Sequence, residues 1–185
     1  MKRLFAILFA GCCLIAVAAC EQTTPAQYFA RAVLNSNLLY GFADSGMQRQ
    51  LASPSEKLTD AKTGASAPMK RAEVLKDKLD AVQSNFDKVK ALSSNDDTKE
   101  MIKASLALYE FALPVYHTEY KALAAMYDSG AAAGKIAALE KSITDKYAAK
   151  FQALHGALIT GGKAYAAKHG IKVREVNPSL RRSGV

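Results

Sequence analysis

Cysteine is scarce in this sequence, and tryptophan is absent. Of the 185 residues, only three are cysteine, namely Cys12, Cys13 and Cys20. All three lie in the N-terminal segment, so residues 21–185 offer no thiol group for catalysis, for a disulfide or for a metal site. A folded domain in this part of the chain must therefore be stabilised by packing and hydrogen bonds.

Sequence motifs for common enzyme chemistry are also missing. No Gly-x-Ser-x-Gly nucleophile elbow, glycine-rich phosphate loop or Cys-x-x-Cys-His haem attachment motif occurs. Metal sites bridged by carboxylates in helical bundles use Glu-x-x-His pairs, and this sequence has none. His117 and His155 fall at different levels of a helical hairpin, so we expect both at the surface or at its edge. We predict a protein that is not an enzyme and binds no metal or other cofactor.

The longest apolar run is too short to span a membrane. It covers residues 4–19, whereas a membrane-spanning helix needs about 20 predominantly apolar residues. Lys2 and Arg3 precede the run, and polar residues follow at once from Glu21. A basic start, a short apolar stretch and small residues at its end are typical of a cleaved export signal.

The end of this run, Val17-Ala18-Ala19-Cys20, resembles the lipobox of bacterial lipoproteins. The resemblance implies cleavage between Ala19 and Cys20 and attachment of a diacylglyceryl group to Cys20. That covalent lipid would anchor the protein to a membrane through its acyl chains. Glu21, rather than aspartate, follows the cysteine, which resembles the signal for the outer membrane. We therefore expect a lipid-anchored protein of the bacterial cell envelope, at the outer membrane.

Two alternatives to this interpretation stay open. The first is a plain secretory signal cut at Ala-x-Ala, which would leave a protein without a lipid anchor. The second places the modified cysteine at Cys12 or Cys13, but Phe9 then occupies the position where a lipobox has Leu, Val or Ile.

The charge of the chain is concentrated near its C-terminus. The formal net charge is +8, from 25 Lys and Arg against 17 Asp and Glu. The segment 171–185 contributes candidate contacts to anionic lipid, envelope polymers or an acidic partner, at Lys172, Arg174, Arg181 and Arg182. The other interpretation of this basic tail, which we prefer, is a solvated chain end. Nucleic acid is not an expected partner, because no motif interleaves aromatic and basic residues.

Apolar residues at alternating steps of three and four positions predict four amphipathic helices. These cover residues 24–51, 68–93, 97–128 and 131–168, with a kink expected at Pro114. We expect an all-α, antiparallel helical bundle whose core includes Leu79, Phe86, Leu106 and Leu154. No alternation typical of a strand is evident, and residues 52–67 are predicted to form a long loop.

The predicted domain order follows from these segments. Residues 1–19 form the signal peptide, and residues 20–24 form the acylated cysteine and a short tether. Residues 25–170 form the helical bundle, and residues 171–185 form the basic tail.

A stripe of tyrosines is the most unusual feature of the predicted bundle. Tyr109, Tyr116 and Tyr120 share one face of the third helix, and Tyr147 lies on the fourth. Such a stripe can form a core in a protein without tryptophan, which is the interpretation we favour. It can also line a groove for an apolar or aromatic ligand.

The leading functional hypothesis is an envelope protein that binds another macromolecule, either a protein or a polymer. Its expected contact surfaces are the 52–67 loop and the basic tail. The main alternative is a carrier of a small ligand that uses the tyrosine groove, and a third is an enzyme of unrecognised type.

Overall fold

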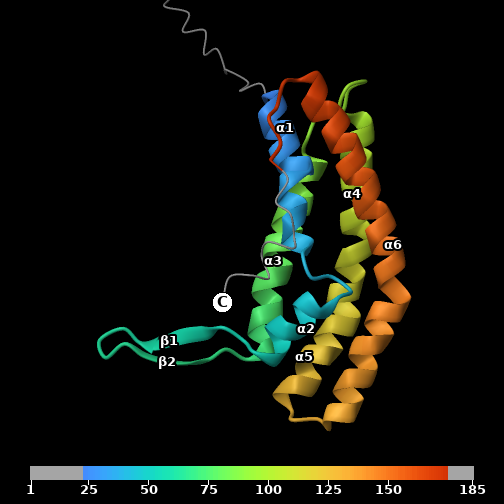
Figure 1. Cartoon of the computed structure of the whole chain (residues 1–185). Coiled ribbons are helices and arrows are strands. Elements are labelled where there is room, and N and C mark those ends of the chain that lie inside the picture. Colours follow the sequence, from blue (N-terminus) through green and yellow to red (C-terminus); the bar gives the residue numbers. More distant parts are fainter. Residues whose placement is uncertain (1–22, 175–185) are drawn as a thin grey trace, which may run out of the picture.

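The computed structural model describes residues 23–174 of the chain (Figure 1). The predicted signal peptide, Cys20 and the part of the basic tail that contains Arg181 and Arg182 lie outside this range. The described residues are mainly helical, as predicted, and no helix among them is long and apolar enough to cross a membrane. The expectation that the chain contains no strand is wrong, because a small two-stranded sheet accompanies the helices.

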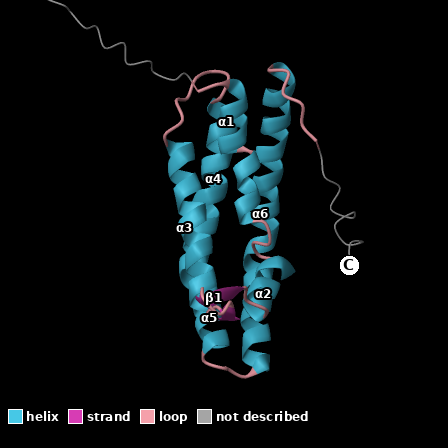
Figure 2. Cartoon of the chain, turned by 90° about the vertical axis from the view of Figure 1, so that its left-hand side faces the viewer, coloured by secondary structure: helices cyan, strands magenta, loops and turns pink. Residues whose placement is uncertain are grey.

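The described range contains six α-helices, one 3₁₀ helix, one π-helix and two strands. In chain order they are α1 (Pro25–Ala32), the 3₁₀ helix η1 (Leu34–Leu39), α2 (Ser45–Ala52), β1 (Glu56–Asp60), β2 (Ala65–Pro68), α3 (Arg71–Lys90), α4 (Lys99–Val115), the π-helix η2 (Tyr116–Tyr120), α5 (Lys121–Asp128) and α6 (Ala133–Lys168). The helices stand side by side and form the helical body, and the strands extend away from it (Figures 1 and 2).

The first helix begins where the sequence predicts it. The side-chain hydroxyl of Thr24 accepts a hydrogen bond from the backbone N–H of Gln27 at 3.3 Å. The side chain of Gln27 accepts one from the backbone N–H of Thr24 at 2.8 Å. This reciprocal capping box satisfies two N–H groups that a helix start leaves without a partner within the helix.

The prediction of one helix over residues 24–51 is wrong. α1 ends at Ala32, a 3₁₀ helix follows, and α2 begins only at Ser45. Between them, Gly41 and Ala43 have φ angles of 85° and 52°, in the left-handed region that a continuous α-helix cannot contain.

Buried side chains from α3 and α4 satisfy the backbone and side chains at this break. The Ser105 hydroxyl donates to the carbonyl of Ala32 at 2.8 Å, and the Tyr109 hydroxyl donates to the carbonyl of Asn35 at 3.0 Å. Asn85, which is 2% exposed, donates to the Tyr109 hydroxyl at 2.6 Å. The break is stable because these partners replace the lost helical hydrogen bonds.

The third predicted helix is divided by a π-helical turn. α4, η2 and α5 follow one another without a gap, and η2 begins two positions after Pro114. Proline has no N–H to donate, so the regular hydrogen-bond ladder is interrupted there. The hydroxyl of Thr118 donates to the Pro114 carbonyl at 2.8 Å. The predicted irregularity at Pro114 therefore takes the form of a wider helical turn.

Two glycines end helices as the sequence suggests. Gly130 and Gly170 have φ angles of 67° and 63° and follow α5 and α6. After α6, the N–H of Ile171 donates to the carbonyl of Ala166 at 2.9 Å. This six-to-one bond with a left-handed glycine is a Schellman motif, and it ends α6 at Lys168, where the fourth helix is predicted to end.

The core differs in detail from the predicted seam. Leu79, Phe86, Leu106 and Leu154 are half-buried against the core, and the fully buried positions lie beside them on the same helices. On α3 the fully buried apolar positions are Leu75, Val82 and Val89. On α3 the half-buried Leu79 and Phe86 therefore lie three or four residues from the fully buried positions, on the same side of the helix.

Candidate functional site

The predicted tyrosine groove is filled by the core. Tyr109 and Tyr116 are 0% exposed and Tyr120 is 1% exposed. Tyr147 is half-buried, and its hydroxyl donates to the carboxylate of Glu119. The core interpretation is therefore correct for the first three tyrosines, and the ligand-groove interpretation is wrong for them.

Phe42 occupies the space beside the tyrosines. It reaches in from the segment between η1 and α2, and its ring centroid lies 4.6 Å from that of Phe151 and 5.5 Å from that of Tyr116. Tyr116 and Tyr120 are stacked with centroids 5.0 Å apart. Burial raises the pKa of Tyr120 to about 12, so its hydroxyl is neutral at physiological pH.

The two histidines are not placed together. His117 is exposed on η2, and His155 is half-buried on α6, where it stacks on Phe151 with ring centroids 6.0 Å apart. Within residues 23–174, no group of three His, Cys, Asp or Glu side chains is arranged to hold a metal ion.

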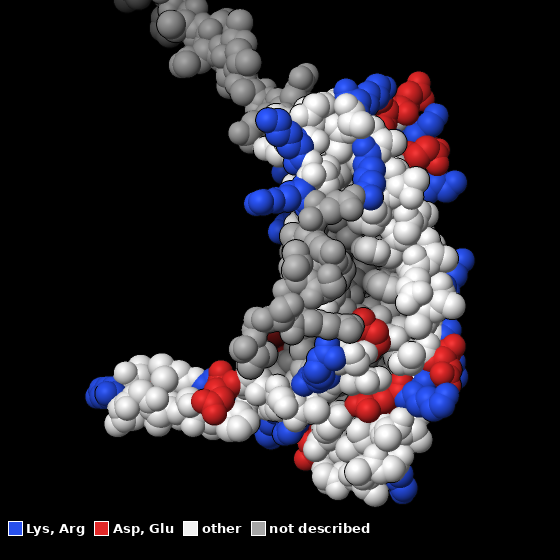
Figure 3. Space-filling view, viewed as in Figure 1, with Lys and Arg blue, Asp and Glu red and all other residues white. Residues whose placement is uncertain are grey.

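The segment predicted as a loop forms a β-hairpin that projects into solvent. β1 and β2 pair antiparallel and stand clear of the helical body (Figures 1 and 3). The turn is closed by a hydrogen bond from the N–H of Gly64 to the carbonyl of Asp60 at 2.9 Å. The Asp60 carboxylate accepts from the N–H of Lys62 at 2.8 Å and from the Thr63 hydroxyl at 2.9 Å. These bonds lower the pKa of Asp60 and fix the tip of the hairpin.

The register shows which backbone groups of the hairpin face outward. Glu56 lies opposite Pro68, Leu58 lies opposite Ser66, and the N–H of Met69 donates to the carbonyl of Ser55 across the hairpin. Hydrogen-bonded and non-hydrogen-bonded pairs alternate along an antiparallel ladder. The backbone groups of Glu56 and Leu58 therefore point away from β2 and form the open edge of β1.

The two edges of the hairpin are not equivalent. On β2 the outward positions are Ser66 and Pro68, and proline has no N–H to offer. The open edge of β1 keeps both N–H groups. It also carries Leu58, which is 61% exposed and is one of the few large apolar side chains exposed in the described range. The edge of β1 is thus the better template for another strand.

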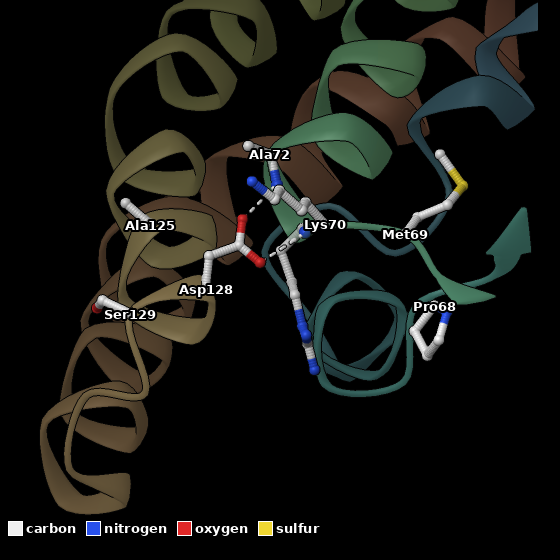
Figure 4. Close-up of a pocket in the computed structure, with 8 residues that line it drawn as sticks. Pro68, Met69, Lys70, Ala72, Ala125, Asp128 and Ser129 are labelled. Atoms are coloured by element: carbon white, nitrogen blue, oxygen red, sulfur yellow. Dashed lines mark hydrogen bonds between the residues drawn. The ribbon is translucent and has the colours of Figure 1, made fainter. Parts of the chain in front are cut away.

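Ion pairs and hydrogen bonds hold the base of the hairpin on the helical body. The ammonium group of Lys57 lies 2.7 Å and 2.9 Å from the two carboxylate oxygens of Glu73, and this contact lowers the pKa of Glu73. The Asp128 carboxylate on α5 accepts from the backbone N–H groups of Arg71 and Ala72 at 2.8 Å and 3.0 Å (Figure 4). A carboxylate at a helix start both satisfies free N–H groups and complements the helix dipole. The Lys57–Glu73 pair therefore links β1 to α3, and Asp128 links the start of α3, which directly follows the hairpin, to α5.

Hollows lie on both sides of the hairpin base. One has a volume of about 630 Å³ and lies between the end of β2 and α5, with Asp128 on its wall (Figure 4). The other has a volume of about 280 Å³ and lies beside the start of β1, with Ser53, Ser55 and Lys78 on its wall. Met69 lines both hollows. The candidate site consists of the open edge of β1 and the smaller hollow next to it.

The basic residues that the sequence singles out lie elsewhere. Lys172 and Arg174 are exposed and follow α6, whose C-terminal end lies at the opposite end of the helical body from the hairpin (Figure 1). The predicted loop and the predicted basic tail are therefore separate surfaces. The sequence pattern did not predict β1, because the strand has only five residues. Asp60 and Gly64 are typical turn residues and were the available signal for a hairpin.

No family model, no curated protein and no solved structure matches this chain. The function is therefore inferred from the geometry of the hairpin and its surroundings.

Proposed function

We propose that this chain is a lipid-anchored protein of the bacterial envelope that binds another protein by adding a strand to the open edge of β1. The observation that carries the proposal is the hairpin itself. Nearly all its side chains are exposed, and the side chain of Leu58 adds nothing to the core. An isolated two-stranded hairpin is marginally stable in water, so a projecting one is unusual in a compact domain unless it is used.

The asymmetry of the hairpin supports strand addition on one side. Added strands bind through main-chain hydrogen bonds, and specificity comes from alternate side chains. β1 offers outward N–H and C=O groups at Glu56 and Leu58, whereas Pro68 interrupts the outer edge of β2. A partner strand along β1 would cover the exposed Leu58 side chain and remove an edge that otherwise invites aggregation.

In this proposal the body is an antiparallel four-helix bundle that holds the hairpin away from the membrane. Its four parts are α1–η1–α2, α3, α4–η2–α5 and α6. The hydroxyl of Tyr28 in α1 donates to the carbonyl of Ser93 at 3.0 Å, so the end of α3 lies beside the start of α1. α3 has 20 residues and spans about 30 Å, with the hairpin at its other end. A lipid on Cys20 would thus leave the hairpin about 30 Å from the anchored end.

Photo-crosslinking in the native envelope tests the proposal. A photo-reactive residue in place of Leu58 is expected to give a discrete adduct with one protein. The second-site change Glu56→Pro removes an outward N–H and should abolish the adduct. Ser66→Pro is the matched control, because it removes an outward N–H from the other edge and should leave the adduct unchanged. Absence of an adduct, or equal loss with both prolines, would contradict strand addition at β1.

A further inference from the structure

The smaller hollow beside the hairpin is lined by a lysine of α3. Lys78 lies on α3 and is half-buried, and it lines the hollow together with Ser53, Ser55 and Met69. Its ammonium group forms no hydrogen bond or ion pair with any residue of the described range 23–174. Burial lowers the pKa of Lys78, because removal of water disfavours the charged form.

Two exposed lysines of the same region, unlike Lys78, form ion pairs with nearby carboxylates. Lys57 pairs with Glu73 at 2.7 Å, and Lys76 pairs with Asp80 at 2.5 Å. Asp77 also lines the hollow of Lys78, but it is exposed and makes no ion pair with that lysine. The partly desolvated ammonium group of Lys78 therefore has no direct ion-pair partner among the described residues, and a ligand carboxylate in the hollow would supply one.

The hollow adjoins the start of β1. Ser53 and Ser55 form part of its wall, and they immediately precede Glu56, the first residue of the open edge. β1 runs from the helical body toward the tip of the hairpin (Figure 1). An antiparallel partner strand would run from the tip toward the body, and its C-terminal end would arrive beside Lys78.

We infer that the partner is an extended segment with a carboxylate at its C-terminal end, and that this carboxylate pairs with Lys78 in the hollow. The inference rests on the proposed strand addition at β1. The ammonium group would donate to the carboxylate, and Ser53, Ser55 and Gln50, which line the same hollow, carry hydroxyl and amide groups that would be further donors. The shared chemistry is a carboxylate, which either an acidic side chain or a free C-terminus supplies.

Synthetic peptides of alternating Thr and Val distinguish the two sources. One peptide ends in a free carboxylate, a second ends in aspartate with an amidated terminus, and a third is amidated and has no acidic residue. Binding to the whole mature protein is measured by fluorescence anisotropy at constant salt. If the first peptide binds most tightly, the carboxylate that pairs with Lys78 is that of a free C-terminus. If the second binds most tightly, it is that of an acidic side chain. The neutral peptide should bind about tenfold more weakly than the preferred one.

Variants of the protein show whether Lys78 is responsible. Lys78→Gln should reduce the affinity for the preferred acidic peptide to that for the neutral peptide, and Lys78→Arg should restore most of it. Lys88→Gln is the control, because Lys88 is exposed on the same helix and the change in net charge is identical. In the wild type, bound acidic peptide should also raise the pKa of the Lys78 ammonium group, which NMR of the lysine side chains reports. Thermal unfolding of each variant confirms that the fold is retained.

Three results would overturn the inference, and they differ in what they say about the proposed function. Equal binding of the acidic and neutral peptides, unaffected by Lys78→Gln, would leave strand addition intact and remove the carboxylate site. Failure of all three peptides to bind at millimolar concentration would overturn the inference together with strand addition at β1. Equal weakening by Lys78→Gln and Lys88→Gln would show a general effect of charge and would also overturn it.

Discussion

The hydroxyl group of Tyr120 accepts a hydrogen bond from the backbone N–H of Ala43 at 2.8 Å, across 77 positions of sequence. Ala43 has a φ angle of 52°, an unfavourable value for a residue with a side chain. The bond satisfies a buried N–H at the break between η1 and α2. One tyrosine of the stripe therefore holds the irregular backbone that carries Phe42 into the core.

Tyr120→Phe is predicted to destabilise the fold by about 1–3 kcal/mol, because the N–H of Ala43 would stay buried without an acceptor. Tyr116→Phe is the matched control. The Tyr116 hydroxyl is buried and has no hydrogen-bond partner in the described range, so its removal should be neutral or slightly stabilising. Urea unfolding of both variants measures the difference. Equal effects would show that the hydrogen bond to Ala43 contributes nothing specific.

Gly162→Ala is predicted to destabilise the fold by about 1–3 kcal/mol through overpacking. A Cβ atom at Gly162 would lie 2.8 Å and 2.9 Å from the two methyl carbons of Val33, where α1 packs on α6. Gly156→Ala on the same helix would meet no atom within 4 Å and should stabilise α6 by up to about 1 kcal/mol. Thermal melts of the two variants should therefore shift in opposite directions, and a shift in the same direction would contradict the close packing at Gly162.

Asp97 is predicted to contribute stability that is lost in acid. Its carboxylate pairs with the ammonium group of Lys168 and lies 2.6 Å from Nε2 of His169, and these contacts lower its pKa below the ordinary value of 3.8. Because the folded-state pKa is depressed, the contribution is present above the unfolded value and disappears as the pH falls through the folded one. Asp97→Asn should lower the melting temperature at pH 7 and leave it unchanged near pH 2. A constant difference across this pH range would rule out the ionised pair as the cause.

The two parts of the C-terminal segment are predicted to differ in their effect on stability. Ile171 packs against the core and completes the cap of α6, whereas Lys172 and Arg174 are exposed. A chain that ends at Arg174 should keep its melting temperature. A chain that ends at Gly170 should melt about 2–4 °C lower for each kcal/mol of lost packing and capping. A large decrease on removal of residues 175–185 alone would show that the basic tail is part of the fold.

Cys20→Ser is predicted to release the protein from membranes or to leave it as an uncleaved precursor. The prediction follows from the lipobox Val17–Cys20, since serine cannot form the thioether. Metabolic labelling with a fatty acid should mark the wild type and spare the variant. Cys13→Ser serves as the control and should retain the label, and a label that persists on Cys20→Ser would refute acylation at this position.

The sequence alone determined the features that depend on neighbouring residues. The capping box at Thr24, the helix over 71–90 and the Schellman cap at Gly170 are visible in the sequence because each uses contacts within a few positions. The lipobox is equally local, and its consequence stays a prediction. The irregularity at Pro114 was expected for the same reason, since the missing N–H is a property of the residue itself.

Only the tertiary structure decided the features that depend on distant partners. The break after Ala32 persists because Ser105, Tyr109 and Tyr120, which lie more than seventy positions away, satisfy its backbone. The same contacts turn the tyrosine stripe from a potential groove into a core. The hairpin contains five-residue and four-residue strands, too short for a clear alternation, and contacts of Glu73 and Asp128 link its base to α3 and α5. Apolar spacing reports which face of a helix is buried, but it does not identify the group that a buried hydroxyl will meet.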